Sequence, residues 1–356
     1  ALRINPDGTG LEAVGTNLRN THDMVVTSFG DVLHNDNDDP AHCRATWLME
    51  YGNLGFASAD GTRTWRADQQ PGQSVAVAEW RQEDPGTIPA GEIYGNGSPT
   101  GICYYENGAL GEKWENLLLS CEAAKRDVYG YHPKPAGAGF EHERFDFFKP
   151  KPGKGNWFRP ADVGVGHDGA IYVADWFDPG VGGHRMQDMG ARGTIYRIAP
   201  KGFKPKNPKV DLGTTAGAIA ALASPANNVR FLGFEALAEV APKRQLALLE
   251  HESPWVRRRA MWIAAHNDAG KFELWGALTS MPEAQDRILA FRALRRVGED
   301  PLKLAKEVAD DESPAVRREA LLALRDVDFE EKRNLLAMLA REYGARDRWY
   351  LEAIGT

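Results

Sequence analysis

Five polar residues in the first half of the chain could together bind an anionic ligand. Arg19 is followed by Asn20, Lys125 is followed by Arg126, and Arg159 stands just before an alternating apolar run. Arginine and lysine bind carboxylates through charge-assisted hydrogen bonds, and a neighbouring amide can bind a carbonyl group. If these positions converge, they form a cationic site that suits a polycarboxylate. Each residue taken alone is more often an ordinary surface charge, and only their convergence favours a site.

A second candidate site is the acidic segment from His34 to Pro40. Oxygen-bearing side chains are the usual ligands of a hard cation such as calcium. The candidate ligands here are Asp36, Asp38 and Asp39. The segment departs from the EF-hand pattern, because the sixth residue counted from Asp36 is Ala41 rather than glycine. A solvated acidic turn is the alternative interpretation.

A glycine-rich loop from Asp175 to His184 carries two carboxylates and a histidine after an apolar strand pattern. It is typical of a functional loop, or of a turn that needs glycine for its backbone angles. The remaining histidines show no metal-ligand spacing. Cys43, Cys103 and Cys121 lack the CxxC spacing of a zinc or haem site, so we expect buried thiols, and the sequence does not say whether any two pair.

Short alternating apolar runs around turn signals indicate β structure up to about Gly202. The clearest run, 163–175, predicts a hairpin around Asp168 and Gly169, and weaker hairpins are expected at 24–36 and 101–120. Repeated hairpin-plus-strand units favour part of a β-propeller of the six-bladed type, with four-stranded blades arranged around an axis. The alternative is a β-sandwich. Strand ends near a propeller axis would bring Arg19, Lys125 and Arg159 together.

Beyond a Pro- and Lys-rich linker at 203–213, the pattern becomes helical from 214 to 356. Ser-Pro pairs at 224–225, 253–254 and 313–314 are typical helix starts. A 30-residue spacing relates two sets of positions: Arg257, Arg287 and Arg317, and Ala260, Ala290 and Ala320. This pattern resembles HEAT repeats and predicts an all-α solenoid whose last unit, beginning near Asp347, is incomplete. We therefore expect a multidomain chain: residues 1–202 all-β, then the linker, then the helices.

The 356 residues carry a formal charge of -7, which disfavours a nucleic-acid binder and favours a small-molecule or protein partner. No apolar stretch is long enough to cross a bilayer, and the first residues do not resemble an export signal.

Short motifs occur in a specific order along the chain: 4–8, 18–20, 30–39, 50–56, 114–118, 125–126, 159–163 and 168–169. In this order they resemble the glucose/sorbosone dehydrogenase family of quinone-dependent propellers. Residues 156–160 and 172–178, followed by the helical units, look more closely like the membrane-bound dehydrogenase family, in which a propeller precedes helical repeats and often a cytochrome c domain.

The resemblance implies an oxidoreductase that binds pyrroloquinoline quinone over a calcium ion and oxidises CH–OH groups of sugars or alcohols. Arg19 and Asn20 would contact the quinone, with Arg19 at the reacting carbonyl, while Lys125 and Arg159 would bind its carboxylates. Asp36, Asp38 and Asp39 would lie by the calcium. A cytochrome c would accept the electrons, and the location would be periplasmic or otherwise extracytoplasmic.

Two departures from the family accompany this resemblance. The family's catalytic histidine precedes the strand that matches residues 1–6, so the base is expected upstream of Ala1, and the chain resembles an internal piece of a larger protein. Only Arg159 stands where relatives carry two arginines. Two alternatives remain: a non-catalytic propeller and HEAT module that binds a glycan or a protein, and a calcium-dependent, lactonase-like hydrolase. The sequence leaves open the substrate, the electron acceptor and the oligomeric state.

Overall fold

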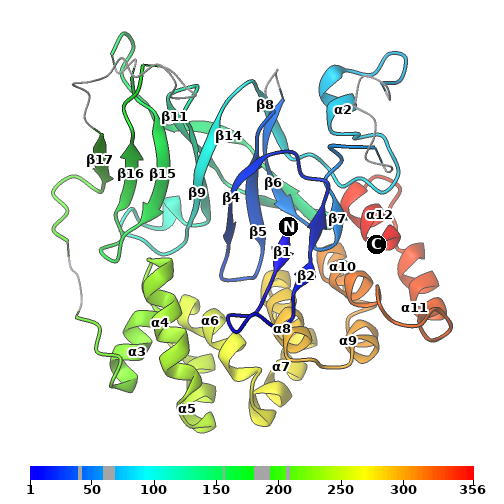
Figure 1. The fold of residues 1–356 in the computed structure, drawn as a ribbon. Helices are drawn as coiled ribbons and strands as arrows, with labels where there is room; N and C mark the ends of the chain where they lie inside the picture. Colours follow the sequence, from blue (N-terminus) through cyan, green and yellow to red (C-terminus); the bar gives the residue numbers. More distant parts are fainter. Residues whose placement is uncertain (39–41, 59–68, 155–156, 180–192, 206–208) are drawn as a thin grey trace.

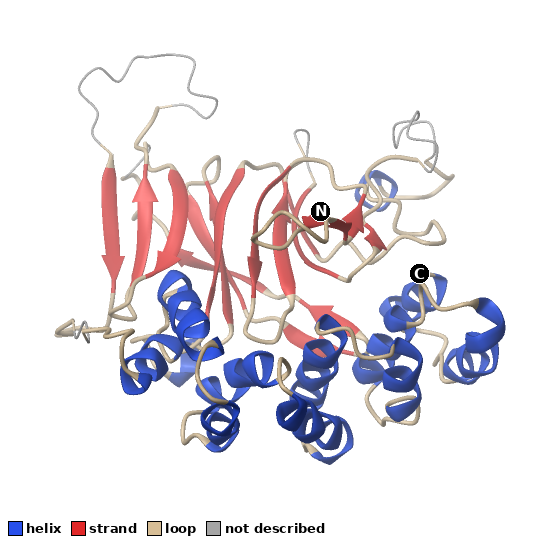
Figure 2. Ribbon diagram, turned by 60° about the horizontal axis from the view of Figure 1, so that its bottom comes forward, coloured by secondary structure: helices blue, strands red, loops and turns tan. Residues whose placement is uncertain are grey.

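The computed structural model describes residues 1–38, 42–58, 69–154, 157–179, 193–205 and 209–356. The chain has mixed β and α structure. Its first part forms sheets that stand side by side, and the helices of its second part follow one end of the strands (Figures 1 and 2). Within the described part of the chain, no helix is both long and apolar enough to cross a membrane.

Three antiparallel sheets form most of the β layer. Their strand orders are β4-β5-β6-β8, β9-β10-β11-β14 and β15-β16-β17. The strands of the first sheet are β4 (Thr21–Val26), β5 (Val32–Asp36), β6 (Cys43–Leu48) and β8 (Glu92–Gly95). Those of the second are β9 (Pro99–Tyr105), β10 (Leu117–Glu122), β11 (Asp127–Tyr131) and β14 (Arg144–Phe148). Those of the third are β15 (Pro160–Val165), β16 (Ile171–Asp175) and β17 (Thr194–Ile198). The first strands β4, β9 and β15 are neighbours, so the three sheets stand side by side in chain order.

The three predicted hairpins are confirmed as β4–β5, β9–β10 and β15–β16. Gly30 and Gly169 take positive φ angles of 80° in two of the connecting turns, a conformation that glycine adopts without steric cost.

The middle sheet has no solvent-facing side along β10. Leu117 and Leu119 lie in the core shared with the third sheet, whereas Leu118 lies in the larger core shared with the first sheet. Successive side chains of a strand point to opposite faces, so a strand packed on both sides reads as a continuous apolar run. This explains the run of three leucines.

Smaller elements complete the first part of the chain. They are β1 (Leu2–Arg3), β2 (Glu12–Ala13), β3 (Gly15–Thr16), β7 (Gly52–Asn53), β12 (Lys134–Ala136), β13 (Gly139–Glu141), helix α2 (Val75–Glu79) and a 3-10 turn at Glu112–Trp114. The β3 and β7 strands pair in parallel, so residues 15–16 lie beside residues 52–53.

The helices of the second part pack as successive antiparallel pairs along the strand ends (Figure 2). They are α3 (Thr215–Leu222), α4 (Asn227–Ala238), α5 (Pro242–Ala247), a 3-10 turn at Leu248–Glu250, α6 (Pro254–Ala264), α7 (Asp268–Ser280), α8 (Ala284–Arg296), α9 (Pro301–Glu307), α10 (Pro314–Ala323), α11 (Phe329–Arg341) and α12 (Arg348–Gly355).

The 30-residue spacing corresponds to equivalent contacts. Arg257, Arg287 and Arg317 each donate through Nη1 to the two carbonyl oxygens five and six residues earlier in the chain. The matching alanines at 260, 290 and 320 are fully buried, which lets neighbouring helices approach closely. The identification of these pairs as HEAT repeats stays a prediction.

One predicted helix start is wrong. Ser253 and Ser313 stand at the N-cap positions of α6 and α10, but Ser224 precedes α4, which begins at Asn227 with Ala226 as its cap. The hydroxyl of Ser224 lies 2.9 Å from the ring of His167 in the β layer and accepts the amide of Ala226 at 3.2 Å, so Ser224 stands before the cap position and contacts the sheets.

The turns at the helix end of the sheets are fixed by buried charges. Glu106, which follows β9, accepts hydrogen bonds from Arg230 of α4 and, at 2.9 Å, from Arg259 of α6. It also accepts the amide and hydroxyl of Ser28, both at 2.7 Å. Since Trp262 donates to the Ser28 carbonyl as well, the β and α parts are joined by specific polar contacts.

A shared hydrophobic core also crosses from strands to helices. It contains Leu33 and Trp47 of the first sheet together with Phe291 of α8 and Trp349 of α12. The Trp47 and Trp349 rings meet edge to face with centroids 5.0 Å apart. The secondary structure therefore changes from strand to helix near residue 202, but one hydrophobic core contains residues from both parts.

Removing the Glu106 charge should destabilise the protein strongly. In Glu106→Gln, the buried Arg259 and the half-buried Arg230 lose their counterion, and we expect a loss of about 3–5 kcal/mol in the free energy of unfolding. Urea unfolding measures this change. Glu143→Gln, which removes an exposed partner of Lys134, should cost at most about 1 kcal/mol. Equal costs for the two variants would contradict the proposed importance of the Glu106 contacts.

Acid should weaken the contact between α8, α10 and the first sheet. Burial raises the pKa of Glu319, but Arg292 and Arg318 lower it more, so the pKa lies at about 2 instead of 4.5. Because the folded-state pKa is below the unfolded one, ionised Glu319 stabilises the fold above about pH 4.5, and this contribution is lost as pH falls toward 2. Urea unfolding between pH 5 and 2 should show a steeper loss of stability for the wild type than for Glu319→Gln, and equal slopes would contradict this.

Candidate functional site

The candidate cations lie at the strand ends that face away from the helices. Arg19 precedes β4, whose other end leads to the Ser28 turn beside α6. Arg159 precedes β15, whose other end leads to His167 beside Ser224. Lys125 lies between β10 and β11, at the end of β10 opposite the Glu106 turn. We call this edge, formed by residues 17–20, 36–38, 96–98, 122–126, 158–159 and 175–179, the rim.

Hydrogen bonds connect the rim from one sheet to the next. Arg19 Nη1 donates to the carbonyl oxygen of Asn37 at 2.7 Å, and Asn37 Nδ2 donates to the Gly97 carbonyl at 3.1 Å. On the second sheet, Lys125 Nζ donates to Asn96 Oδ1 at 2.5 Å. Arg159 Nη1 donates to the Ala123 carbonyl at 3.2 Å. The rim thus carries the predicted cations from three consecutive sheets.

Arg159 is the most strongly constrained of these cations. It is 6% exposed, and its guanidinium donates to the carbonyls of Ala123, Phe158 and Pro179. Its Nε is buried and has no hydrogen-bond partner among the described residues. Burial lowers the pKa of Arg159, and the positive charge of Arg126 lowers it further. Two like charges and an unused donor make this part of the rim suitable for an anion.

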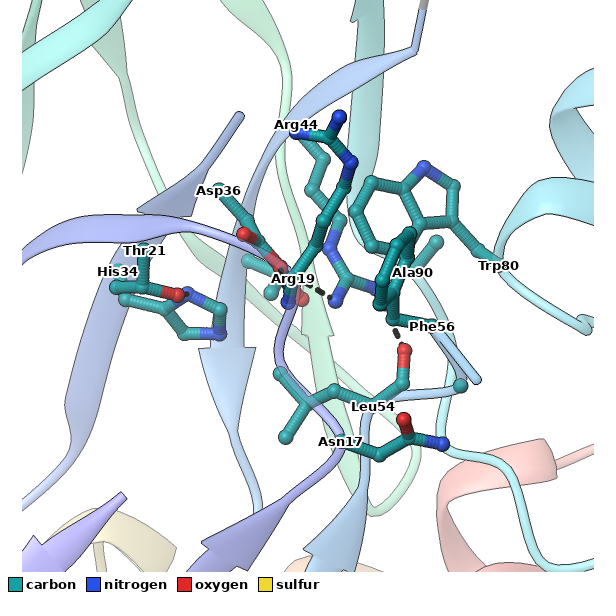
Figure 3. A network of polar contacts seen from close by, with 12 residues as sticks. Asn17, Arg19, Thr21, His34, Asp36, Arg44, Leu54, Phe56, Trp80 and Ala90 are labelled. Carbon is teal, nitrogen blue, oxygen red and sulfur yellow. Dashed lines mark hydrogen bonds and ion pairs between the residues drawn. The ribbon is translucent and has the colours of Figure 1, made fainter. Parts of the chain in front are cut away.

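A buried ion pair between Asp36 and Arg44 lies next to Arg19 (Figure 3). Asp36, the last residue of β5, accepts the backbone amide of Arg19 at 3.2 Å and that of Asn20 at 2.7 Å. It also pairs with Arg44 Nη2 at 3.0 Å, and both side chains are fully buried. The Arg44 guanidinium lies 3.6 Å from the centroid of the Trp80 ring.

The acidic turn contains a second buried carboxylate, Asp38. Its Oδ1 lies 3.5 Å from Arg19 Nε, and its Oδ2 accepts the His42 amide at 2.8 Å. Nearby Glu79, at the end of α2, is also buried. Burial, followed by the charge of Asp38, raises the pKa of Glu79 to about 7.

These contacts engage carboxylate oxygens of two of the predicted calcium ligands, Asp36 and Asp38. The carboxylate of Asp36 already accepts donors from Arg44 and two backbone amides, and Asp38 lies against Arg19. Among the residues with described positions, no group of three or more His, Cys, Asp or Glu side chains could hold a metal ion. Asp39 lies outside the described residues, so the calcium site stays a prediction.

The glycine-rich loop after β16 is described only to Pro179. Asp175 Oδ1 accepts the amides of Arg159 and Phe177, each at 2.8 Å. Phe177 has a positive φ of 55°, and its ring lies against Trp157 with centroids 5.6 Å apart. The remainder of the predicted loop, from Gly180 to His184, lies outside the described residues.

The sequence interpretation missed the residues that support the rim from below. Arg44 lies inside β6, and Trp80 and Glu122 show no motif. Glu122 Oε1 accepts the amides of Ser98 at 2.6 Å, Ala124 at 3.0 Å and Lys125 at 3.4 Å. A charged residue within an otherwise apolar strand was the available signal, because a buried charge needs a partner.

The three cysteines are buried free thiols, in agreement with the sequence interpretation. Cys43 Sγ lies below the acidic turn, where it accepts the amide of Asp38 at 3.3 Å. Burial raises the pKa of Cys43 to about 11. This places Cys43 in the reduced, unreactive class of structural cysteines.

Native Cys43 should therefore resist alkylation. With a pKa of about 11, on the order of one molecule in a thousand carries the thiolate at pH 8, and the sulfur is also shielded from solvent. Mass spectrometry of the peptide that contains Cys43 after treatment with iodoacetamide measures the reaction. The urea-unfolded protein is the control and should react rapidly. Equal rates in the two states would contradict the buried environment.

The fold and the rim define a protein of mixed β and α structure with a candidate anion site at its strand ends. Residues 1–201 match the model of the DUF7133 family, described as a domain of unknown function, and the chain belongs to this family. No curated protein matches the chain.

Several solved structures are similar to part of the chain. The apo form of the soluble aldose sugar dehydrogenase from Escherichia coli is 16% identical, with 46% of this chain and 43% of that chain covered and a TM-score of 0.34. A glucose dehydrogenase-type oxidoreductase from Thermus thermophilus is 14% identical, with 52% and 46% covered and a TM-score of 0.36. A further glucose dehydrogenase is 13% identical, with 52% and 45% covered and a TM-score of 0.37. The chain spans less than half the length of each of these proteins.

Proposed function

We propose that the rim binds a polycarboxylate cofactor and that the chain is part of a quinone-dependent dehydrogenase that oxidises CH–OH groups of a sugar or alcohol. The observation that carries this proposal is the convergence of Arg19, Lys125 and Arg159 on one edge of three consecutive sheets. The buried Nε of Arg159 adds a donor with no partner among the described residues. Strand ends on one side of adjacent blades are where propellers bind their ligands.

The donor set fits pyrroloquinoline quinone, a planar quinone with several carboxylates. Lys125 supplies a mobile point charge, and Arg159 supplies a planar guanidinium that can form paired hydrogen bonds with a carboxylate. Arg19 and Asn20 would contact the quinone oxygens from the first sheet. When bound, such a quinone supplies a hydride acceptor for an alcohol carbon. The residues of this chain bind and orient it, and Arg19 places positive charge where negative charge would develop.

Calcium does not fit the described part of the acidic turn. The oxygens of Asp36 are already used by Arg44 and the amides of Arg19 and Asn20. The described part of the acidic turn therefore supports no calcium-dependent step.

The wider organisation is proposed on the ordered sequence motifs. We propose that residues 1–202 are part of a six-bladed propeller, that 203–213 are a linker and that 214–356 are HEAT-type repeats. A cytochrome c as electron acceptor and an extracytoplasmic location belong to the same proposal. The continuous core between strands and helices supports a role for the helices in holding the blades in place.

The direct test is binding of pyrroloquinoline quinone to the full-length protein in the presence of calcium, measured by isothermal titration calorimetry. Arg159→Ala and Lys125→Ala should each weaken binding by about 1.5–3 kcal/mol, roughly tenfold to a hundredfold, because each removes a charge-assisted contact. Lys134→Ala is the control, because Lys134 is an exposed cation paired with Glu143 away from the rim, and it should leave the affinity unchanged.

Activity is tested by following dye reduction with a panel of aldoses and simple alcohols. If the wild type neither binds the quinone nor reduces the dye, the proposal is overturned. Turnover of lactones with calcium and without quinone would instead indicate the hydrolase.

A further inference from the structure

The three sheets share a feature at the rim that the sequence does not reveal as a repeat. In each sheet the second strand ends in a carboxylic acid: Asp36 ends β5, Glu122 ends β10 and Asp175 ends β16. All three side chains are at most 3% exposed. An acidic residue at the same position of three consecutive sheets is a structural repeat within the β layer.

Each of these carboxylates binds the backbone of the cation that its own sheet contributes to the rim. Asp36 accepts the amides of Arg19 and Asn20 on the first sheet. On the second, Glu122 accepts the amides of Ala124 and Lys125.

On the third sheet the hydrogen bond from the cation's backbone amide to the carboxylate is shorter than on the other two sheets. Asp175 accepts the amide of Arg159 at 2.8 Å. The pairing of an acid with a rim cation therefore occurs in every one of the three sheets.

We propose that Asp36, Glu122 and Asp175 are positioning residues, which set the backbone, and hence the direction, of Arg19, Lys125 and Arg159 at the ligand site. Backbone amides are fixed donors, and a buried carboxylate binds them strongly because neither partner is hydrated. The hydrogen bonds of these carboxylates reach the backbone of the three residues, while the side chain of Arg19 lies against Asp38. The identity of the ligand rests on the proposed function, whereas the positioning contacts do not.

This assigns Asp36 a role different from the expected one. The equivalence with Glu122 and Asp175, which lie in no acidic cluster of the sequence, indicates a shared structural task rather than cation binding. Arg44 is the additional partner of Asp36, and it is held by the Trp80 ring and by the Leu54 carbonyl at 3.1 Å. The first sheet thus uses an ion pair to support its carboxylate.

Amide hydrogen exchange without any ligand tests the positioning directly. Asp175 forms no salt bridge with the described residues. In Asp175→Asn, exchange at Arg159 and Phe177 should accelerate about tenfold or more, because a charged hydrogen bond is lost. Amides of β10 should keep their rates. Asp31→Asn is the matched control, a buried aspartate paired with Arg292 at the opposite end of the first sheet, and it should leave exchange at the rim unchanged.

Asp36→Asn should likewise accelerate exchange at Arg19 and Asn20. If this variant does not fold, because Arg44 loses its counterion, Arg44→Lys replaces it, since a lysine keeps the charge but cannot reach both Asp36 and Leu54 as the guanidinium does. Rim exchange rates that change no more in these variants than in Asp31→Asn would overturn the inference.

Quinone binding gives a second readout that a purely structural role would not produce. If Asp175 acts through Arg159, Asp175→Asn should weaken pyrroloquinoline quinone binding about tenfold when it is the only substitution. Added to Arg159→Ala, it should hardly weaken binding further. Added to Lys125→Ala, the two losses of binding free energy should sum. Additivity with Arg159→Ala would overturn the inference. Absence of quinone binding by the wild type would end the proposed function, and the exchange experiment would still decide the positioning role.

Discussion

A carboxylate that is removed from water must accept hydrogen bonds or pair with a cation, and this requirement fixes both ends of the β layer. At the helix end, Glu106 binds two arginines of the helices and the Ser28 turn. At the rim, Asp36 and Asp175 bind backbone amides that precede the first strands of their sheets. The same physical need therefore attaches the helices at one end and shapes the candidate site at the other.

The helix end and the rim of the β layer differ in the partners that their carboxylates bind. Arg230 and Arg259 each form an ion pair with Glu106, which suits a permanent contact between strands and helices. At the rim the acids bind mainly main-chain donors, and Arg159 and Lys125 contact carbonyl or amide oxygens. The hydrogen bonds of these two side chains go to neutral oxygens and not to carboxylates, so the rim is the better candidate for ligand binding.

The helical layer supports this arrangement from a distance. Arg292 of α8 binds Asp31 at the turn between β4 and β5, and Glu319 of α10 holds the same guanidinium at 2.8 Å. Burial lowers the pKa of Arg318, but contact with Glu319 opposes this effect. The helices thereby hold the far ends of the strands whose near ends carry Arg19 and Asp36.

The sequence alone determined the local structure: the three hairpins, the change to helices near residue 202, and the 30-residue position shared by Arg257, Arg287 and Arg317. These features depend on strand or helix periodicity and turn residues, which act over a few neighbours. Only the tertiary structure decided that Ser224 meets His167 instead of capping a helix, and that Asp36 meets Arg44 and the Arg19 backbone. The partners of a buried charge come from distant parts of the chain, and the folded packing, rather than local spacing, selects them.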